Sequence, residues 1–180
     1  MRQLIFQEYV TLDGYAADAA GEPSFFGTIG EHEAEDRATF ERIDTMLLGA
    51  ETYRLFVGVW PSADHPMAPL LNALRKVVVS TTIEDAPWGS HEPATVVRDL
   101  DAVRALKAED GKDIMLWGSI SLFRSLLAAG LVDEVELRVC PLLLGAGRSL
   151  FPADGSRLGL ELIEARPWAG NGVLLRYRPN

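Results

Sequence analysis

The sequence predicts an α/β protein with a mostly parallel central sheet, flanking helices and an antiparallel C-terminal hairpin. Two observations carry this prediction. From residue 4 to residue 140, short apolar runs alternate with segments of helical periodicity, which is the pattern of parallel strands joined by helices. After that, two strand-like segments flank the turn sequence AGNG at 169–172, which favours a β-hairpin.

The individual elements follow from apolar patterning and turn residues. The expected strands are 4–12, 45–48, 76–80, 94–97, 114–117, 135–139, 160–168 and 172–177. The expected helices are 31–43, a short one through Tyr53 and Phe56, one capped by Asp99 and stopped by Gly111, and one between Ser119 and Gly130. Loops are expected at 16–30 and around Pro61, Pro66 and Pro69. Since no linker divides the chain, residues 1–180 are expected to form one domain.

The segment 113–151 is the most informative part of the chain. Its apolar strand runs into Gly118-Ser119, where Ser119 is expected to cap the following helix. Gly130 is expected to end that helix. A strand that turns into a helix N-terminus exposes free backbone N–H groups, which suit an anion such as a pyrophosphate. Many βαβ units have the same layout and bind nothing there, so the local pattern leaves both interpretations open.

The composition excludes several classes of protein. The net charge of −9 and the lack of any Lys/Arg cluster argue against a nucleic-acid partner, which requires clustered basic residues. The single cysteine, Cys140, cannot form an internal disulfide, and no His/Cys spacing predicts a metal site. No apolar run is long enough for a membrane span, and Gln7 and Glu8 interrupt any signal-peptide core. A cytoplasmic location is therefore expected.

Four segments occur in the order typical of one family. They are TLDGY at 11–15, LLGAETYRLF at 47–56, KVVVSTTI at 76–83 and the long segment 117–151 with its GLVDE and LGAGRSLF sequences. In these segments the chain resembles the dihydrofolate-reductase-like family that includes the reductase domain of the riboflavin-biosynthesis deaminase–reductase. The resemblance extends over nearly the whole chain.

The resemblance implies a dihydrofolate-reductase fold, NADPH as hydride donor and a homodimer. It also implies which residues would bind the cofactor. The pyrophosphate would lie against Gly49, Glu51, Thr52, Gly118, Ser119, Ile120, Ser121 and Leu122, and the adenosine 2′-phosphate against Ser80, Thr81 and Thr82. Glu51 follows the glycine where many relatives have a basic residue. It is either a favourable acid in a first helical turn or a charge that repels the 2′-phosphate.

Two carboxylates are the candidates for catalysis. Asp13 lies in the loop that the resemblance places over nicotinamide and substrate, although Asp-Gly also favours a plain turn. Asp36 begins a D-x-x-x-F pattern with Phe40, which resembles the helix of the active-site carboxylate in dihydrofolate reductases. A carboxylate in an apolar cleft has a raised pKa and can support proton delivery. The alternative for Asp36 is a solvated helix face.

The sequence therefore predicts an NADPH-dependent reductase that transfers a hydride to a small heterocyclic or imine/carbonyl metabolite, either pterin-like or ribosylaminopyrimidine-like. The alternative is a non-catalytic dimeric protein that keeps the fold and binds a ligand. Ala50-Glu51 favours the alternative slightly, because the basic residue of many relatives is missing there.

Overall fold

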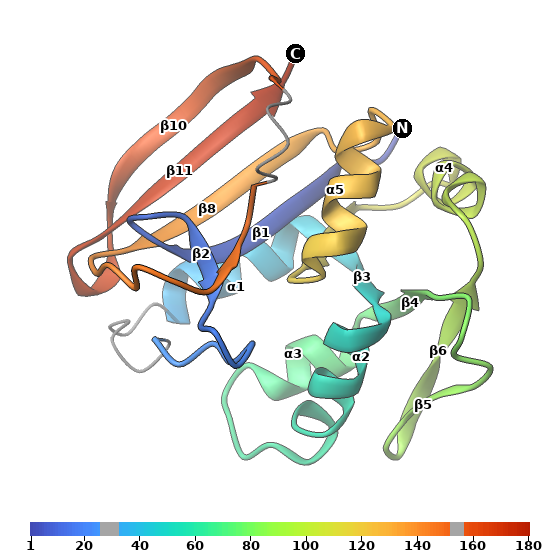
Figure 1. Ribbon diagram of the computed structural model, residues 1–180. Coiled ribbons are helices and arrows are strands. Elements are labelled where there is room, and N and C mark those ends of the chain that lie inside the picture. Colours follow the sequence, from blue (N-terminus) through green and yellow to red (C-terminus); the bar gives the residue numbers. More distant parts are fainter. Residues whose placement is uncertain (26–32, 152–156) are drawn as a thin grey trace. The chain divides into compact units, whose positions relative to one another are not determined.

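The computed structural model describes residues 1–25, 33–151 and 157–180, with only the backbone described for 33–35 (Figure 1). The chain forms two compact units. The first consists of Met1–Ile5 and Glu33–Leu131, and the second of Phe6–His32 and Val132–Asn180. The end of the expected 16–30 loop and the start of the expected 31–43 helix lie outside the described residues.

The first unit contains the parallel part of the fold. Its strands are β3 (Ile43–Gly49), β4 (Arg75–Val79), β5 (Ala86–Trp88), β6 (His91–Val97) and β7 (Asp113–Trp117). They are arranged in the order β7-β3-β4-β6-β5. β3 is parallel to β4 and β7, and β4 is parallel to β6, whereas β5 runs antiparallel to β6. The apolar runs that predicted β3, β4 and β7 are buried in the sheet.

The helices of the first unit connect these strands. They are α1 (Glu33–Arg42), α2 (Ala50–Val57), the 3₁₀ turn η2 (Trp60–Ser62), α3 (Ala68–Ala73), α4 (Leu100–Ala108) and α5 (Ile120–Ala128). The predicted loop around the prolines is confirmed at Pro66 but wrong at Pro61 and Pro69, where η2 and α3 form. Pro61 and Pro69 stand in the first turn of each, where the missing N–H would have no helical partner anyway. The strand β5 is a further element that the sequence did not predict.

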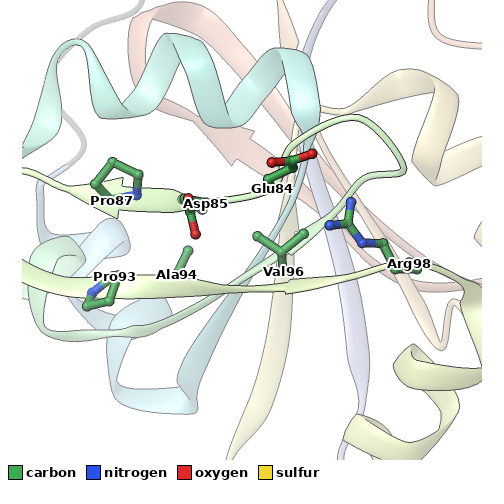
Figure 2. Close-up of a pocket in the computed structure, with 8 residues that line it drawn as sticks. Glu84, Asp85, Pro87, Pro93, Ala94, Val96 and Arg98 are labelled. Atoms are coloured by element: carbon green, nitrogen blue, oxygen red, sulfur yellow. The ribbon is translucent and has the colours of Figure 1, made fainter.

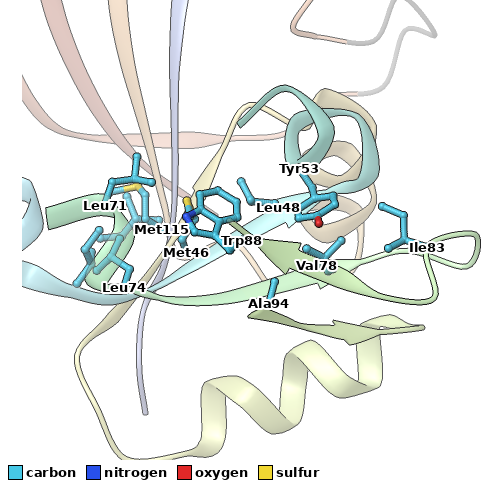
Figure 3. Packing of buried hydrophobic residues seen from close by; sticks show 13 residues of the cluster. Met46, Leu48, Tyr53, Leu71, Leu74, Val78, Ile83, Trp88, Ala94 and Met115 are labelled. Atoms are coloured by element: carbon cyan, nitrogen blue, oxygen red, sulfur yellow. The ribbon is translucent and has the colours of Figure 1, made fainter. Parts of the chain in front are cut away.

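Trp88 of β5 is the centre of the core of the first unit. It is fully buried, and Figure 3 shows its ring among Met46, Leu71 and Met115. Its indole N–H donates a 2.7 Å hydrogen bond to the side chain of Asn72. That bond satisfies the one polar atom that burying the ring would otherwise leave without a partner.

The second unit contains the remaining strands of the chain, including the antiparallel C-terminal ones. They are β1 (Leu4–Thr11, whose first two residues belong to the first unit), β2 (Tyr15–Ala17), β8 (Glu134–Cys140), β9 (Arg148–Ser149), β10 (Leu160–Trp168) and β11 (Gly172–Pro179). Strands β10, β11, β8 and β1 are neighbours in this order. The predicted hairpin is confirmed: β10 pairs with β11, and Gly170 and Asn171 have the positive φ angles that the turn requires.

A charged cluster lies inside the second unit. Arg138 of β8 is buried, and its guanidinium stacks over the rings of Tyr9 and Trp168 at 5.2 and 5.1 Å. Arg176 of β11 donates two hydrogen bonds to the buried carboxylate of Glu134, at 2.8 and 2.9 Å. Buried charges persist in proteins when they are paired in this way.

No helix within 1–25, 33–151 and 157–180 is long and apolar enough to cross a bilayer.

Candidate functional site

Three of the predicted cofactor-binding loops lie at one edge of the parallel sheet. In the pairing of β3 with its neighbours, Gly49 is opposite Val79 of β4, and Leu47 is opposite Leu116 of β7. Since these strands are parallel, the residues that follow them emerge at the same edge. The loops 49–52, 80–83 and 118–122 are therefore neighbours, and such an edge is where ligands bind in open α/β sheets.

Ser119 joins two of these loops directly. Its hydroxyl accepts the backbone N–H of Gly49 at 2.8 Å and lies 2.9 Å from the hydroxyl of Thr52. A Cβ atom on Gly49 would lie 3.2 Å from the Ser119 hydroxyl, so a larger residue would require the serine side chain to shift by a few tenths of an ångström. Two helix starts, those of α2 and α5, are thus held against each other by one serine side chain.

The predicted role of Ser119 as a helix cap is wrong. Ser119 does occupy the position before α5, but its side chain makes no capping hydrogen bond. Its backbone is left-handed, with φ of 60°, and follows Gly118 with φ of 54°. A left-handed non-glycine residue is uncommon and strained. With this left-handed backbone, the Ser119 hydroxyl bonds across to the start of α2 and makes no bond to the first turn of α5.

This arrangement leaves the first turn of α5 open. In the described part of the chain no side chain caps α2 or α5. The N–H groups of Ile120, Ser121 and Leu122 therefore form the positive end of α5 without a side-chain acceptor there. A strained turn before an uncapped helix start fits the pyrophosphate of a dinucleotide, which accepts such N–H groups.

The loop 80–83 is organised by Ser80 and Arg98. The Ser80 hydroxyl accepts the N–H groups of Thr82 and Ile83 at 3.1 and 3.0 Å. Arg98, directly after β6, donates from Nη1 to the carbonyls of Ser80 and Ile83 at 2.9 and 2.7 Å. Thr81 and Thr82 are exposed. A cation therefore lies at the loop where the sequence analysis expected only hydroxyls.

Arg98 is a residue that the sequence analysis missed. Its position in the sequence could have identified it, because it directly follows an expected parallel strand, as the other candidate loops do. Its Nη2 and Nε atoms have no protein acceptor in the part of the chain that the structure describes. They are available to an anion at the loop 80–83.

A shallow hollow borders this loop (Figure 2). It measures about 450 Å³ and lies between β5 and β6, with Ala94, Val96 and Pro87 in its lining. Arg98 lines it at the end near the loop with Glu84 close by, and Asp85 lies farther along, near Ala94 (Figure 2). None of the predicted cofactor-binding residues lines the hollow.

The two candidate carboxylates lie in different units. Asp36 is half-buried on α1 of the first unit, one turn before Phe40. Asp13 lies in the second unit, where its carboxylate accepts the N–H groups of Leu144 and Gly145 and the hydroxyl of Thr11. The Thr11 hydroxyl and the Gly145 N–H hold the pKa of Asp13 below its usual value. The charged carboxylate of Asp13 therefore holds two loops of its unit together.

Glu51 lies in the first turn of α2 and is exposed. This is the position where an acid stabilises a helix through its dipole, so the helix-start interpretation of Glu51 agrees with the geometry. Among the described residues no group of His, Cys, Asp and Glu side chains could hold a metal ion.

Comparison with known proteins identifies related sequences and structures. The sequence profile of the RibD C-terminal domain matches residues 2–175. YyaP, an uncharacterised protein of Bacillus subtilis, is 30% identical over 186 residues, covering 99% of this chain and 96% of YyaP. A putative riboflavin biosynthesis protein from a Shewanella species superposes with a TM-score of 0.82 at 22% identity, over 99% of both chains. Dihydrofolate reductase from Enterococcus faecalis, complexed with NADP(H), superposes with a TM-score of 0.66 at 16% identity, over 99% of this chain and 96% of the enzyme. These two structures establish the fold, which is dihydrofolate-reductase-like.

Proposed function

Because this chain belongs to the RibD C-terminal domain family, we propose that it is an oxidoreductase that uses NADPH to reduce a C=N or C=O carbon of a small heterocyclic metabolite. Family membership supports a reductase-type function. The geometry of the first unit supports a nicotinamide cofactor.

The observation that carries the proposal is the pair of helix starts joined by Ser119. The N-termini of α2 and α5 lie together because the Ser119 hydroxyl binds the Gly49 N–H at 2.8 Å. Two uncapped N-termini side by side give a larger positive potential than one. That potential suits the two adjacent charges of a pyrophosphate, which is the group that all nicotinamide cofactors share.

Bound at this edge, NADPH would supply the hydride, and the residues of the chain would bind, orient and protonate. The first-turn N–H groups of α5 would hold the pyrophosphate. Asp36, half-buried on α1, is the proposed group that holds a proton near the substrate. The carboxylate of Asp13 accepts two backbone N–H groups and a hydroxyl within its own unit, so no proton transfer is proposed for it.

Arg98 supports NADPH over NADH. The adenosine 2′-phosphate is the only group by which the two cofactors differ, and it requires a cation or several donors. Arg98 provides a cation at the loop that carries Thr81 and Thr82, where it binds the carbonyls of Ser80 and Ile83. Glu51 acts in the opposite direction if it faces the adenosine, so the proposed preference for NADPH is moderate.

A non-catalytic ligand-binding protein remains the second candidate. One observation favours it: the Gly49 N–H and the Ser119 hydroxyl, both expected to bind phosphate, bind each other instead. Turnover separates the two candidates. Oxidation of NADPH in the presence of a reducible heterocycle supports the reductase, and tight cofactor binding without turnover across a panel of pterins and pyrimidines supports the alternative.

The test of the cofactor site is a charge placed in the first turn of α5. Ser121 is exposed there. Ser121→Asp should stabilise the helix by a few tenths of a kcal/mol through its dipole, while its carboxylate repels the pyrophosphate and weakens NADPH binding by about tenfold or more. The matched control is Ser121→Asn, which has the same shape without the charge and should bind nearly as the wild type does.

The opposite signs of the two effects make this test specific. A misfolded variant would lose both stability and binding, whereas a charge at the phosphate site lowers binding alone. Titration of NADPH by its fluorescence and chemical unfolding give the two quantities. Equal NADPH affinity in Ser121→Asp and Ser121→Asn would remove the start of α5 from the cofactor site.

A further inference from the structure

Strand β6 has an unpaired edge in the first unit. On one side its residues 95–97 pair with β4. On the other side β5 pairs with β6 only through Ala86 with Ala94 and Trp88 with His91. Beyond Ala94 no strand of the described chain covers that side of β6, and the hollow of about 450 Å³ lies there (Figure 2).

The backbone of Val96 faces this hollow. The carbonyl of Val97 accepts the N–H of Ser80, the residue that follows β4, so the backbone groups of Val97 point toward β4. Since the backbone groups of successive strand residues point to opposite sides within a sheet, the N–H and C=O of Val96 point away from β4. Val96 lines the hollow, and neither of its backbone groups has a hydrogen-bond partner in the described part of the chain. A strand edge of this kind binds the backbone of another extended segment.

Opposite charges stand at the two ends of this edge. Nη1 of Arg98 donates to two carbonyls of the loop 80–83, which holds the guanidinium at one end of the hollow. Its Nη2 and Nε atoms have no acceptor among the described residues. Asp85 lies farther along, near Ala94 (Figure 2), and forms no ion pair within the described chain. A cation and an anion separated along an open strand edge are complementary to the two charged ends of a short peptide.

We propose that the hollow binds a short peptide with free ends, extended along β6. Its carboxylate accepts hydrogen bonds from Arg98, a central peptide group pairs with the N–H and C=O of Val96, and its ammonium group faces Asp85. Arg98 and Ala94 are about 13 Å apart along an extended strand. Three extended residues span about 10 Å, so a tripeptide reaches both charges with the help of the two side chains.

The far end of the hollow limits the length of the peptide. Pro87 and Pro93 line it there, and a proline has no N–H to pair with a further strand. Protection of a sheet edge accounts for these two prolines. It does not account for the unpaired backbone of Val96 or for a guanidinium that two carbonyls hold beside it. The site lies outside the predicted cofactor-binding residues, and its proposal does not depend on the proposed reductase function.

Glu84 gives the proposal a test in which the direction of change matters. Its carboxylate lies close to Arg98 (Figure 2) and forms no ion pair with it. A bound carboxylate at Arg98 would be repelled by Glu84, whereas an ammonium group near Asp85 would be attracted. Glu84→Gln should therefore strengthen peptide binding about two- to threefold at low salt, and Asp85→Asn should weaken it about two- to fivefold.

The probe is trialanine, because its methyl side chains leave the backbone and the two charges as the means of recognition. Titration of the isotope-labelled whole chain without cofactor, followed by backbone amide resonances, should move the amide resonance of Val96. The C-terminal amide of trialanine should bind about tenfold or more weakly, because it lacks the carboxylate. The N-acetyl form should bind about two- to fivefold more weakly. An ester in place of the central amide should cost about threefold or more, because it removes the N–H that the carbonyl of Val96 accepts.

The protein variants complete the test. Arg98→Gln should lose about tenfold or more of the trialanine affinity. Glu92→Gln is the control, since Glu92 is an exposed acid of β6 that does not line the hollow, and it should bind trialanine nearly as the wild type does. Equal binding of trialanine and its C-terminal amide, or a Val96 resonance that stays in place at millimolar trialanine, would overturn the proposal. A change in the same direction in Glu84→Gln and Asp85→Asn would also overturn it, because it would reflect the net charge of the protein and not a peptide with two ends.

Discussion

The hydroxyl of Ser119 accepts the backbone N–H of Gly49 at 2.8 Å, across 70 residues of sequence. Gly49 is the last residue of β3, Ser119 follows the end of β7 by two residues, and each immediately precedes a helix. Ser119 makes this bond with a left-handed backbone, and its side chain does not cap α5. Such a compromise of local preference for a long-range contact is expected at a functional site.

Replacing Ser119 should separate its side-chain role from its backbone role. Ser119→Gly removes the hydroxyl but adopts the left-handed conformation without strain. The half-buried Gly49 N–H then loses its acceptor, at a cost of about 1–3 kcal/mol. Ser119→Ala should cost about 1 kcal/mol more, because alanine bears the strain as well. Urea unfolding measures both differences.

The matched control for these variants is Ser125→Ala on the same helix. Ser125 is exposed, and its hydroxyl only donates to the carbonyl of Ser121 one turn earlier. Its loss should change the free energy of unfolding by less than about 0.5 kcal/mol. If Ser119→Ala, which keeps the backbone strain and loses only the hydroxyl, is as mild as this control, the bond to Gly49 is not what holds the two helix starts together.

Cofactor preference should respond to Arg98 and Glu51 in opposite directions. Arg98→Gln removes the charge at the loop 80–83 and should lower the NADPH preference, expressed as the ratio of NADH to NADPH dissociation constants, by about tenfold. Glu51→Lys should raise the same ratio by about two- to fivefold at low salt if residue 51 faces the adenosine. The ratio is informative because a distorted loop would weaken both cofactors alike. An unchanged ratio in Arg98→Gln would show that Arg98 only braces the carbonyls of Ser80 and Ile83.

Burial of Glu8 predicts a pH-dependent stability. Burial raises the pKa of this carboxyl from 4.5 to about 8, although its oxygen accepts the N–H of Tyr9. The folded chain therefore holds a proton on Glu8 between these pH values, while the unfolded chain releases it. Stability should fall as pH rises through this window, by up to about 1.4 kcal/mol per pH unit.

Glu8→Gln tests this pH dependence. Glutamine keeps the shape and the acceptor for Tyr9 but has no proton to release. At pH 8 the variant should be more stable than the wild type by about 1 kcal/mol or more, and near pH 4.5 the two should be nearly equal. Denaturant unfolding at both pH values measures this. Parallel stability curves for the two proteins would show that Glu8 is charged in the folded chain.

The parts of the fold that depend on local sequence could be predicted. Asp99 caps α4 by accepting the N–H of Ala102 at 2.9 Å, and Gly130 ends α5 with a positive φ, both as their residue types indicate. The strand β5 could not be predicted. Its Ala-Pro-Trp sequence has no alternation, and Trp88 becomes a core residue only through contacts with Met46 and Leu71 from distant segments.

The candidate site also contains one part that the local sequence predicts and another that it does not. Gly118 and the residues after it could be found because a strand, a glycine and a helix follow one another in the chain. The link from Ser119 to Gly49 and the position of Arg98 on the 80–83 loop depend on which strands are neighbours in the sheet. Sequence periodicity carries no information on that pairing, so these relationships appeared only in the structure.

The second unit should form a homodimer through its C-terminal hairpin. Leu160, Leu162 and Ile163 of β10 and Val173 of β11 are between 39% and 55% exposed, and β10 is at the end of the strand order in its sheet. A long apolar edge strand invites pairing with another chain, and a two-fold contact lets one such surface cover its own copy. We therefore expect sedimentation at micromolar concentration to give twice the mass of the chain.

Leu162→Lys tests the role of this surface. In a two-fold contact the lysine of one copy would lie near the same lysine of the other copy, and the two positive charges would repel each other. The variant should therefore sediment as a monomer with an unchanged far-ultraviolet circular dichroism spectrum. Leu55→Lys is the control, because Leu55 is similarly exposed but lies on α2 of the first unit. That variant should remain a dimer. A monomeric wild type would contradict the prediction, and a Leu162→Lys dimer would assign the contact to another surface, such as the one around Leu143, which is 70% exposed.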